Sequence, residues 1–179
     1  MALFGTVYTF ERNTAIASDT TIQNGHGSPN ARTGMSKCMF RPSDDAVILP
    51  FLIPANAMTV VELRKTADMI DSLVVPTNYD QLSEQMRSLA DEIDSAIAQY
   101  GTTFNQITGE KTFVYEADGF GNTVFMDDAN ITGLLSLPYL EYIDRSDPVY
   151  LATRRAVLSR ATNPYFFSGF AGEGVGGPH

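Results

Sequence analysis

Two pairs of adjacent aspartates are the residues of this sequence best placed to do chemistry. Asp44 and Asp45 lie in the segment FRPSDDA, next to the strongly apolar run VILPFLIP, and Asp127 and Asp128 lie in the segment MDDAN. Two carboxylates held close together resist ionising at the same time, so one of them can keep its proton near neutral pH. An acidic cluster of this kind could supply a general acid.

The side chains around these pairs are typical of a sugar-binding site. Carboxylates and amides form hydrogen bonds with vicinal hydroxyl groups, and aromatic rings offer flat faces to the C–H side of a sugar ring. Two carboxylates with separated pKa values also suffice for glycoside hydrolysis, one as acid and the other as base or nucleophile. The surrounding polar residues are Arg41, Asn56, Glu116, Asp118, Asn122 and Asn130, and the interleaved aromatic residues are Phe40, Tyr115, Phe120 and Phe125.

Each acidic pair also has an ordinary structural explanation. An aspartate at the start of a helix usually accepts hydrogen bonds from free backbone N–H groups, and this role suits Asp127 and Asp128. Asp44 and Asp45 could cap a helix and form an ion pair with Arg41. The acidic loops lack the spacing of an EF-hand calcium site, and the segment GEGVGG lacks the Lys-Ser/Thr of a phosphate-binding loop.

Composition indicates one globular domain and excludes several classes of protein. The chain has 179 residues, 44% of them hydrophobic, which is enough for one sizeable core. A net charge of −9 argues against nucleic-acid binding. Cys38, His26 and His179 are too few and too scattered for a metal site, so no metal or cofactor is expected. No apolar run is long enough for a membrane span, and the start MALFGTVYTFER does not resemble a signal peptide.

Hydrophobic periodicity predicts four helices joined by long, polar, glycine-rich loops, and hence a mostly α fold. The first helix is predicted over residues 55–73. The second and clearest covers residues 78–100, with Thr77 or Asn78 as its N-cap and Gly101 at its C-terminal end.

The other predicted elements surround the second acidic pair. A third helix is expected from Asp127/Asp128 through residue 143, shortened or kinked by Pro138. A fourth is expected from the segment SDP through residue 160, because a capping residue there precedes a proline in the first helical turn. Short strands or extended segments are predicted at residues 5–12 and 113–115, and loops at residues 13–36 and in the tail 163–179.

Long motifs in a fixed order resemble glycoside hydrolase family 125, the exo-α-1,6-mannosidases. They are FRPSDDA with FLIPANAM and VELR, then YEADGFGNTVFMDDANITGLLSLPYL, then DPVY, TRR, LSR and NPYFFSG, and finally GEGVGGPH. The resemblance covers nearly the whole chain. It implies an (α/α)6 barrel, inversion of configuration, no metal, and a mannose-containing glycan as substrate.

The resemblance also implies roles for particular residues. It makes either Asp44 or Asp45 the general acid and does not choose between them. It makes Asp118, Asp127, Asp128 and Asn130 ligands of the terminal mannose, with Arg41, Glu116 and His179 facing the same cleft. The loop NGHGSPNARTGMSKCMF departs from the family pattern, which leaves the sugar contacts of that loop open.

The family domain is more than twice as long as this chain, and its general base, a glutamate, lies beyond GGPH. The chain is therefore expected to be a truncated, single partial catalytic domain, with residues 1–54 forming a loop-rich segment and residues 55–179 forming helical hairpins with acidic loops. It is expected to be inactive by itself. The alternatives are a non-catalytic mannose-binding remnant and a partial gene model. The compartment stays open, since any secretion signal would precede Met1.

Overall fold

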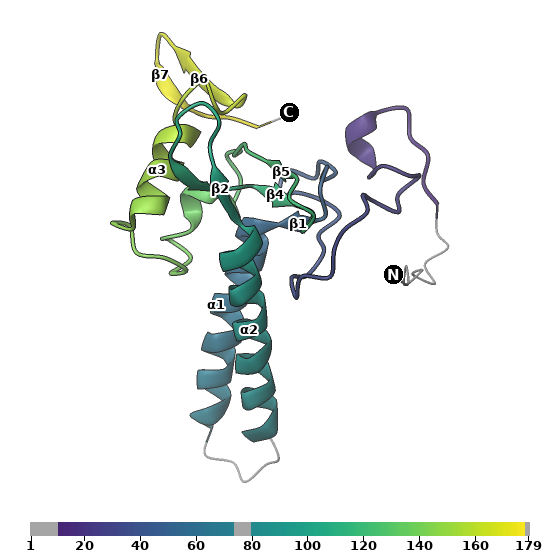
Figure 1. Ribbon diagram of the computed structural model, residues 1–179, viewed down its shortest axis with the longest axis vertical. Coiled ribbons are helices and arrows are strands. Elements are labelled where there is room, and N and C mark those ends of the chain that lie inside the picture. Colours follow the sequence, from purple (N-terminus) through teal and green to yellow (C-terminus); the bar gives the residue numbers. More distant parts are fainter. Residues whose placement is uncertain (1–10, 74–79, 178–179) are drawn as a thin grey trace.

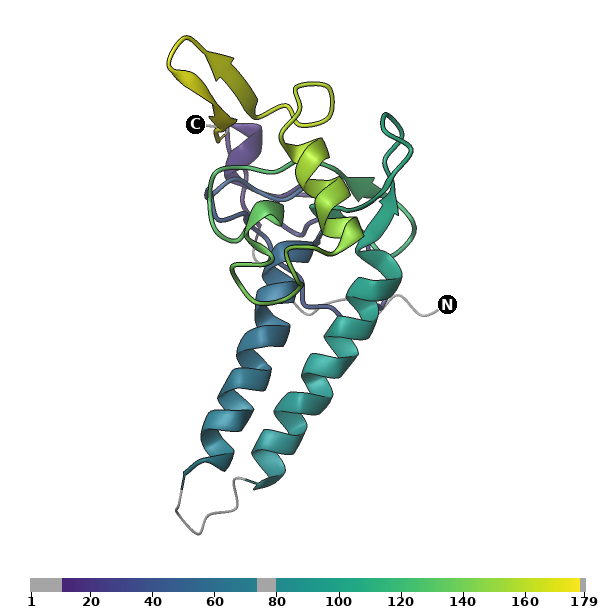
Figure 2. The same cartoon turned by 90° about the vertical axis from the view of Figure 1, so that its left-hand side faces the viewer.

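The computed structural model describes residues 11–73 and 80–177. Its largest feature is an antiparallel pair of helices, α1 (Ile53–Asp71) and α2 (Asp80–Tyr100), which project side by side from the rest of the molecule (Figures 1 and 2). Both were predicted from periodicity, although α1 begins two residues before the predicted start. The predicted caps Thr77 and Asn78 lie outside the described residues.

Gly101 ends α2 for a steric reason. Its N–H donates to Ile97 O at 2.7 Å, and a Cβ at this position would lie only 2.7 Å from that same oxygen. A side chain larger than hydrogen therefore does not fit here. The chain then turns directly into the strand β2 (Thr102–Phe104), which pairs antiparallel with β3 (Lys111–Phe113).

The hydrophobic core lies where the base of the helical pair meets the strands. The first turns of α1 contribute Ile53, Ala57 and Val60, and the last turns of α2 contribute Ile93 and Ile97. A three-stranded antiparallel sheet in the order β1–β4–β5 lies beside them, formed by β1 (Phe51–Leu52), β4 (Glu116–Ala117) and β5 (Thr123–Val124). The loops that carry the acidic residues are therefore attached to the core, at the base of the helical pair.

Ion pairs between largely exposed side chains connect the two helices. Arg64 Nη2 lies 2.8 Å from Asp91 Oδ1 and 2.9 Å from Asp94 Oδ2, and Arg87 bridges to two aspartates of α1 in the same way. Solvent screens such pairs, so they set the register of the helices more than they stabilise the fold.

The predicted third helix is wrong. The segment 127–143 contains only one 3₁₀ turn, η2 (Leu134–Ser136), followed by further turns. Gly133 before it is extended, Pro138 after it has no backbone N–H to donate, and Glu141 has a φ of 65°, in the left-handed region. The apolar spacing of this segment reflects burial of Leu134 and Leu137 in the core and not a helical period.

The fourth predicted helix is confirmed as α3 (Pro148–Val157), which ends three residues before the predicted end. The Asp147 carboxylate accepts hydrogen bonds from the backbone N–H groups of Val149 and Tyr150, as its place before a proline indicated. The N-terminal strand predicted at residues 5–12 falls mostly outside the described residues.

The glycine-rich tail was predicted to be a loop, and this is also wrong. It forms an antiparallel hairpin of β6 (Phe166–Gly169) and β7 (Gly172–Val175), drawn in yellow in Figure 1. Gly172 at the turn has a φ of 146°, which glycine adopts without strain. The chain is therefore partly helical with small sheets, and the expectation of a mostly α chain is met only in part. Within the described residues, no helix is both long and apolar enough to cross a membrane.

Candidate functional site

The arginine of the first motif is buried in an ion pair with a residue far along the chain. Arg41 Nε lies 2.7 Å from Glu116 Oε1, and the two side chains are 7% and 0% exposed. Glu116 Oε2 accepts hydrogen bonds from the backbone N–H groups of Ile48 and Leu49 at 2.9 and 3.0 Å. Both oxygens of this carboxylate are thus engaged inside the protein, and the pair ties the FRPSDDA segment to β4.

Asp44 and Asp45 lie in a tight turn that the backbone of Arg41 closes. The Arg41 N–H donates to Asp45 O at 2.8 Å, and the Asp44 N–H donates to Arg41 O at 3.0 Å. The two side chains differ in environment. Asp45 is 6% exposed and its Oδ2 accepts a hydrogen bond from the Ser43 hydroxyl, whereas Asp44 is exposed and has a φ of 65°. Only Asp44 presents its carboxylate at the surface of this turn.

Asp118 shapes the loop YEADGFG. Its Oδ1 accepts from the backbone N–H groups of Phe120 and Asn122, and its Oδ2 accepts from Asn122 Nδ2 at 2.6 Å. The following glycine, Gly119, has a φ of 76°, and a Cβ there would lie 2.5 Å from Thr33 Cγ2. The loop is therefore fixed by its own carboxylate and by close packing against the segment near Thr33.

Asp127 caps the 3₁₀ turn η2. Its two carboxylate oxygens accept from the backbone N–H groups of Leu134 and Leu135 at 2.8 and 2.9 Å, and the side chain is completely buried. Burial raises the pKa of Asp127 from 3.8 to about 7, although the two N–H donors act in the opposite direction. The residue is thus a cap, as its position in the sequence suggested, but of a 3₁₀ turn.

We expect this carboxylate to make stability depend on pH. Because its folded pKa lies above its unfolded value, the protonated form stabilises the fold below pH 4, and that stabilisation is lost as the pH rises towards 7. Asp127→Asn cannot ionise. The difference in free energy of unfolding between the wild-type protein and this variant should therefore become smaller from pH 4 to pH 7, by no more than about 4 kcal/mol. Urea denaturation of both proteins at several pH values measures this, and a cost that is constant with pH would contradict the assignment.

Asp128 lies at a cavity together with other residues of MDDAN. The cavity has a volume of about 380 Å³, and its lining includes Asp127, Asp128 and Asn130 from this segment and Val175 from β7. Asp128 Oδ1 accepts from the backbone N–H of Asn130 at 2.9 Å, and its Oδ2 accepts from the Tyr115 hydroxyl at 3.3 Å. A carboxylate and an amide side chain thus line one hollow of a size suited to a sugar ring.

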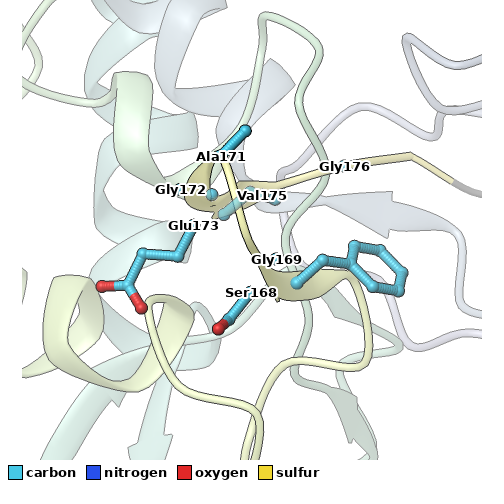
Figure 3. Close-up of a pocket in the computed structure, with 9 residues that line it drawn as sticks. Ser168, Gly169, Ala171, Gly172, Glu173, Val175 and Gly176 are labelled. Carbon is cyan, nitrogen blue, oxygen red and sulfur yellow. The ribbon is translucent and has the colours of Figure 1, made fainter.

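The β6–β7 hairpin forms a second, more open hollow of about 490 Å³ (Figure 3). Ser168 and Glu173 are paired across the two strands, so their side chains share one face of the hairpin. The two hollows have Gly174 and Val175 in common. The backbone N–H of Ala129 donates to Gly176 O at 2.9 Å, which holds the hairpin against the MDDAN segment.

The structure connects the two motifs that the sequence singled out. Arg41 binds Glu116 and lies over the ring of Tyr115, with its guanidinium carbon 5.8 Å from the ring centroid, and the Tyr115 hydroxyl reaches Asp128. His179, expected to face the same cleft, lies outside the described residues.

Sequence reasoning missed two residues of this arrangement. The sequence indicates Tyr115 only as an aromatic ring, whereas in the structure its hydroxyl contacts Asp128. Asn163 received no role, yet its Oδ1 accepts from the backbone N–H of Asp127 at 3.3 Å and its Nδ2 donates to Val157 O. Its position before a proline was the only local signal. Across residues 11–73 and 80–177, no group of three or more potential metal ligands comes together.

Comparison with known proteins assigns the chain to a family. A family model described as metal-independent alpha-mannosidase (GH125) matches residues 3–179. The chain belongs to this family, glycoside hydrolase family 125.

The chain is also similar to a curated protein and to a solved structure. The chain is 43% identical over 174 residues to the meiotically up-regulated gene 157 protein of Schizosaccharomyces pombe. It is also similar to a Streptococcus pneumoniae structure, described as one of the metal-independent alpha mannosidases in a non-productive complex with alpha-1,6-mannobiose. That match has 40% identity and a TM-score of 0.89. Both matches cover 97% of this chain, which spans 33% of the yeast protein and 40% of the Streptococcus chain.

Proposed function

We propose that this chain forms part of the catalytic domain of an inverting exo-α-1,6-mannosidase, which removes terminal α-1,6-linked mannose from a glycan. The observation that carries the proposal is the cavity lined by Asp128 and Asn130, in a chain that matches the metal-independent alpha-mannosidase family over residues 3–179. The complex of the Streptococcus neighbour with alpha-1,6-mannobiose supports the choice of substrate.

In this proposal a carboxyl group of FRPSDDA protonates the glycosidic oxygen. Asp44 and Asp45 are the candidates, and the exposure of Asp44 favours it, since a donor has to reach the substrate. Asp118, Asp127, Asp128 and Asn130 bind or shape the pocket of the terminal mannose, while Arg41 and Glu116 support it from within.

In this proposal the general base is a glutamate of the longer catalytic domain and not a residue of this chain. An inverting pair needs a carboxyl separation of about 6.5–9.5 Å to admit the attacking water. We infer that the described helices are one part of an (α/α)6 barrel. The apolar side chains of Met69, Leu82 and Leu89 on the helical pair are between 42% and 58% exposed, which fits this inference.

The chain by itself is then expected to bind mannose without hydrolysing its linkage. A non-catalytic mannose-binding protein is therefore the second candidate function, and the same observation favours it, because the cavity is formed within these residues whereas the base is not. Whether the chain acts alone or as part of a longer catalytic domain decides between the two functions.

A graft tests the proposal. The chain replaces the matching segment of the Streptococcus pneumoniae mannosidase, and both the chimera and the chain alone are assayed on α-1,6-mannobiose. We expect the chimera to release mannose with inversion, seen as β-mannose in the first NMR spectra, and the chain alone to show no turnover. Turnover by the chain alone would contradict the inactivity. A folded but inactive chimera would contradict the catalytic proposal, and calorimetry with mannose would then test the binding function.

A further inference from the structure

We propose that Tyr115 is a positioning residue of this site, whose hydroxyl holds the Asp128 carboxylate in the orientation that binds sugar at the cavity. The inference rests on the proposed function and deepens it. Tyr115 Oη lies 3.3 Å from Asp128 Oδ2, and Asp128 lines the cavity that also holds Asn130. The tyrosine acts through the aspartate, since it is itself 0% exposed and not among the residues that line the cavity.

The ring of Tyr115 is fixed from several directions. Its backbone N–H donates to Val124 O, and its carbonyl oxygen accepts from the N–H of Ile53 at the start of α1, both at 2.9 Å. One face of the ring lies under the Arg41 guanidinium, which the buried contact with Glu116 holds in place. A side chain anchored in this way can impose an orientation on a neighbour, because it cannot follow that neighbour when it moves.

The hydrogen bond can run in only one direction. Burial, together with the negative charges of Asp128 and Asp127, raises the pKa of the Tyr115 hydroxyl far above its usual range, so it keeps its proton at every pH of use. An ionised carboxylate only accepts hydrogen bonds. Tyr115 is therefore the donor in this contact, and Asp128 Oδ2 is the acceptor.

The Asp128 carboxylate consequently has one local and one distant anchor. The local anchor is the N–H of Asn130, which donates to Oδ1 from within the same segment. The distant anchor is Tyr115, thirteen residues earlier in the chain, which donates to Oδ2. Without the second anchor the carboxylate can turn about its Cβ–Cγ bond, and its free lone pairs no longer point at a fixed sugar hydroxyl.

Tyr115→Phe removes the hydroxyl and leaves the ring beneath Arg41 in place. In the chimera, we expect kcat/KM on α-1,6-mannobiose to fall about 10- to 100-fold, the range typical of a misplaced binding group. Asp128→Ala removes the carboxylate that Tyr115 contacts and should cause a fall at least as large. The double variant should lose little more than Asp128→Ala alone, since Tyr115 acts only through Asp128. Unfolding midpoints in urea should change little.

Tyr142→Phe is the matched control. Its hydroxyl also donates to an aspartate, Asp94 of α2, at 2.8 Å, and neither residue lines the cavity. This variant should keep full activity. As a spectroscopic readout that does not depend on turnover, the carboxyl ¹³C resonance of Asp128 in the chain alone should move in Tyr115→Phe and stay in place in Tyr142→Phe.

The outcomes separate the positioning role from the proposed function. The positioning role of Tyr115 is supported if the double variant loses little more activity than Asp128→Ala alone and the Asp128 resonance shifts in Tyr115→Phe. An active chimera in which the two substitutions multiply their effects, or a resonance that does not move, overturns it and leaves the mannosidase proposal intact. A folded chimera without turnover overturns the proposed function and with it the role of Tyr115, even if the resonance moves.

Discussion

Replacing Asp44 by asparagine in the chimera is expected to lower kcat on α-1,6-mannobiose about 10²- to 10⁴-fold, the usual contribution of a general acid. The leaving mannose is a poor leaving group unless its oxygen receives a proton. An aryl mannoside with an acidic phenol needs no such proton, so the same variant should keep most of its activity on that substrate. The comparison of the two substrates measures proton donation separately from binding.

The backbone conformation of Asp44 accepts asparagine without strain. Asp44 has a φ of 65°, a conformation that asparagine adopts as readily as aspartate, so the replacement should leave the turn intact. Asp45→Asn and Asp128→Asn serve as comparisons. If the selective loss on mannobiose appears in Asp45→Asn instead, the acid is the other member of the pair. If it appears in Asp128→Asn, the assignment of the acid to FRPSDDA is wrong.

The helices could be predicted because their determinants are local. The apolar spacing along α2, the glycine after it, and the Asp-Pro start of α3 each act within a few residues, and all three agree with the structure. Local rules failed where tertiary contacts decide. The segment after Asp127 has helix-like apolar spacing, yet both oxygens of the Asp127 carboxylate accept hydrogen bonds from a 3₁₀ turn. The glycine-rich tail is ordered by the pairing of two strands.

The composition of the candidate site could be predicted, but not the role of each group. Acidic, amide and aromatic side chains were recognised as a set from their types. The partner of Arg41 lies 75 residues away, so local spacing could not reveal that Glu116 is engaged inside the protein. Likewise, only the folded arrangement brings the Tyr115 hydroxyl to Asp128. Residue types therefore predict a chemistry, but only the fold shows which of these groups contact one another.

Glu116→Gln is expected to be the most destabilising conservative substitution among these carboxylates, costing about 3–5 kcal/mol in free energy of unfolding. The change removes the negative charge beside Arg41, which then stays buried and uncompensated. It also replaces one acceptor by an amide donor, although Arg41 Nε and the N–H groups of Ile48 and Leu49 all need acceptors. Urea denaturation of the chain measures the cost.

Glu110→Gln is the control for the loss of an Arg–Glu contact as such. Arg155 Nη2 lies 2.6 Å from Glu110 Oε1, but the two side chains are 57% and 44% exposed, so this change should cost at most about 1 kcal/mol. A cost for Glu116→Gln no larger than that of the control would show that burial does not strengthen the Arg41–Glu116 pair.

A second substitution tests why the loss at Glu116 is large. The main cause of the loss could be the unpaired buried charge of Arg41. In that case Arg41→Met combined with Glu116→Gln should be more stable than Glu116→Gln alone, because methionine removes the guanidinium and keeps an apolar side chain. Recovery should be incomplete, since Ile48 and Leu49 still lack a carboxylate acceptor and Tyr115 loses its cationic neighbour. A double variant that is less stable than Glu116→Gln would instead assign the cost to the lost hydrogen bonds. The Arg41 side chain would then stabilise the fold through its stem and its contact with Tyr115 even without a partner.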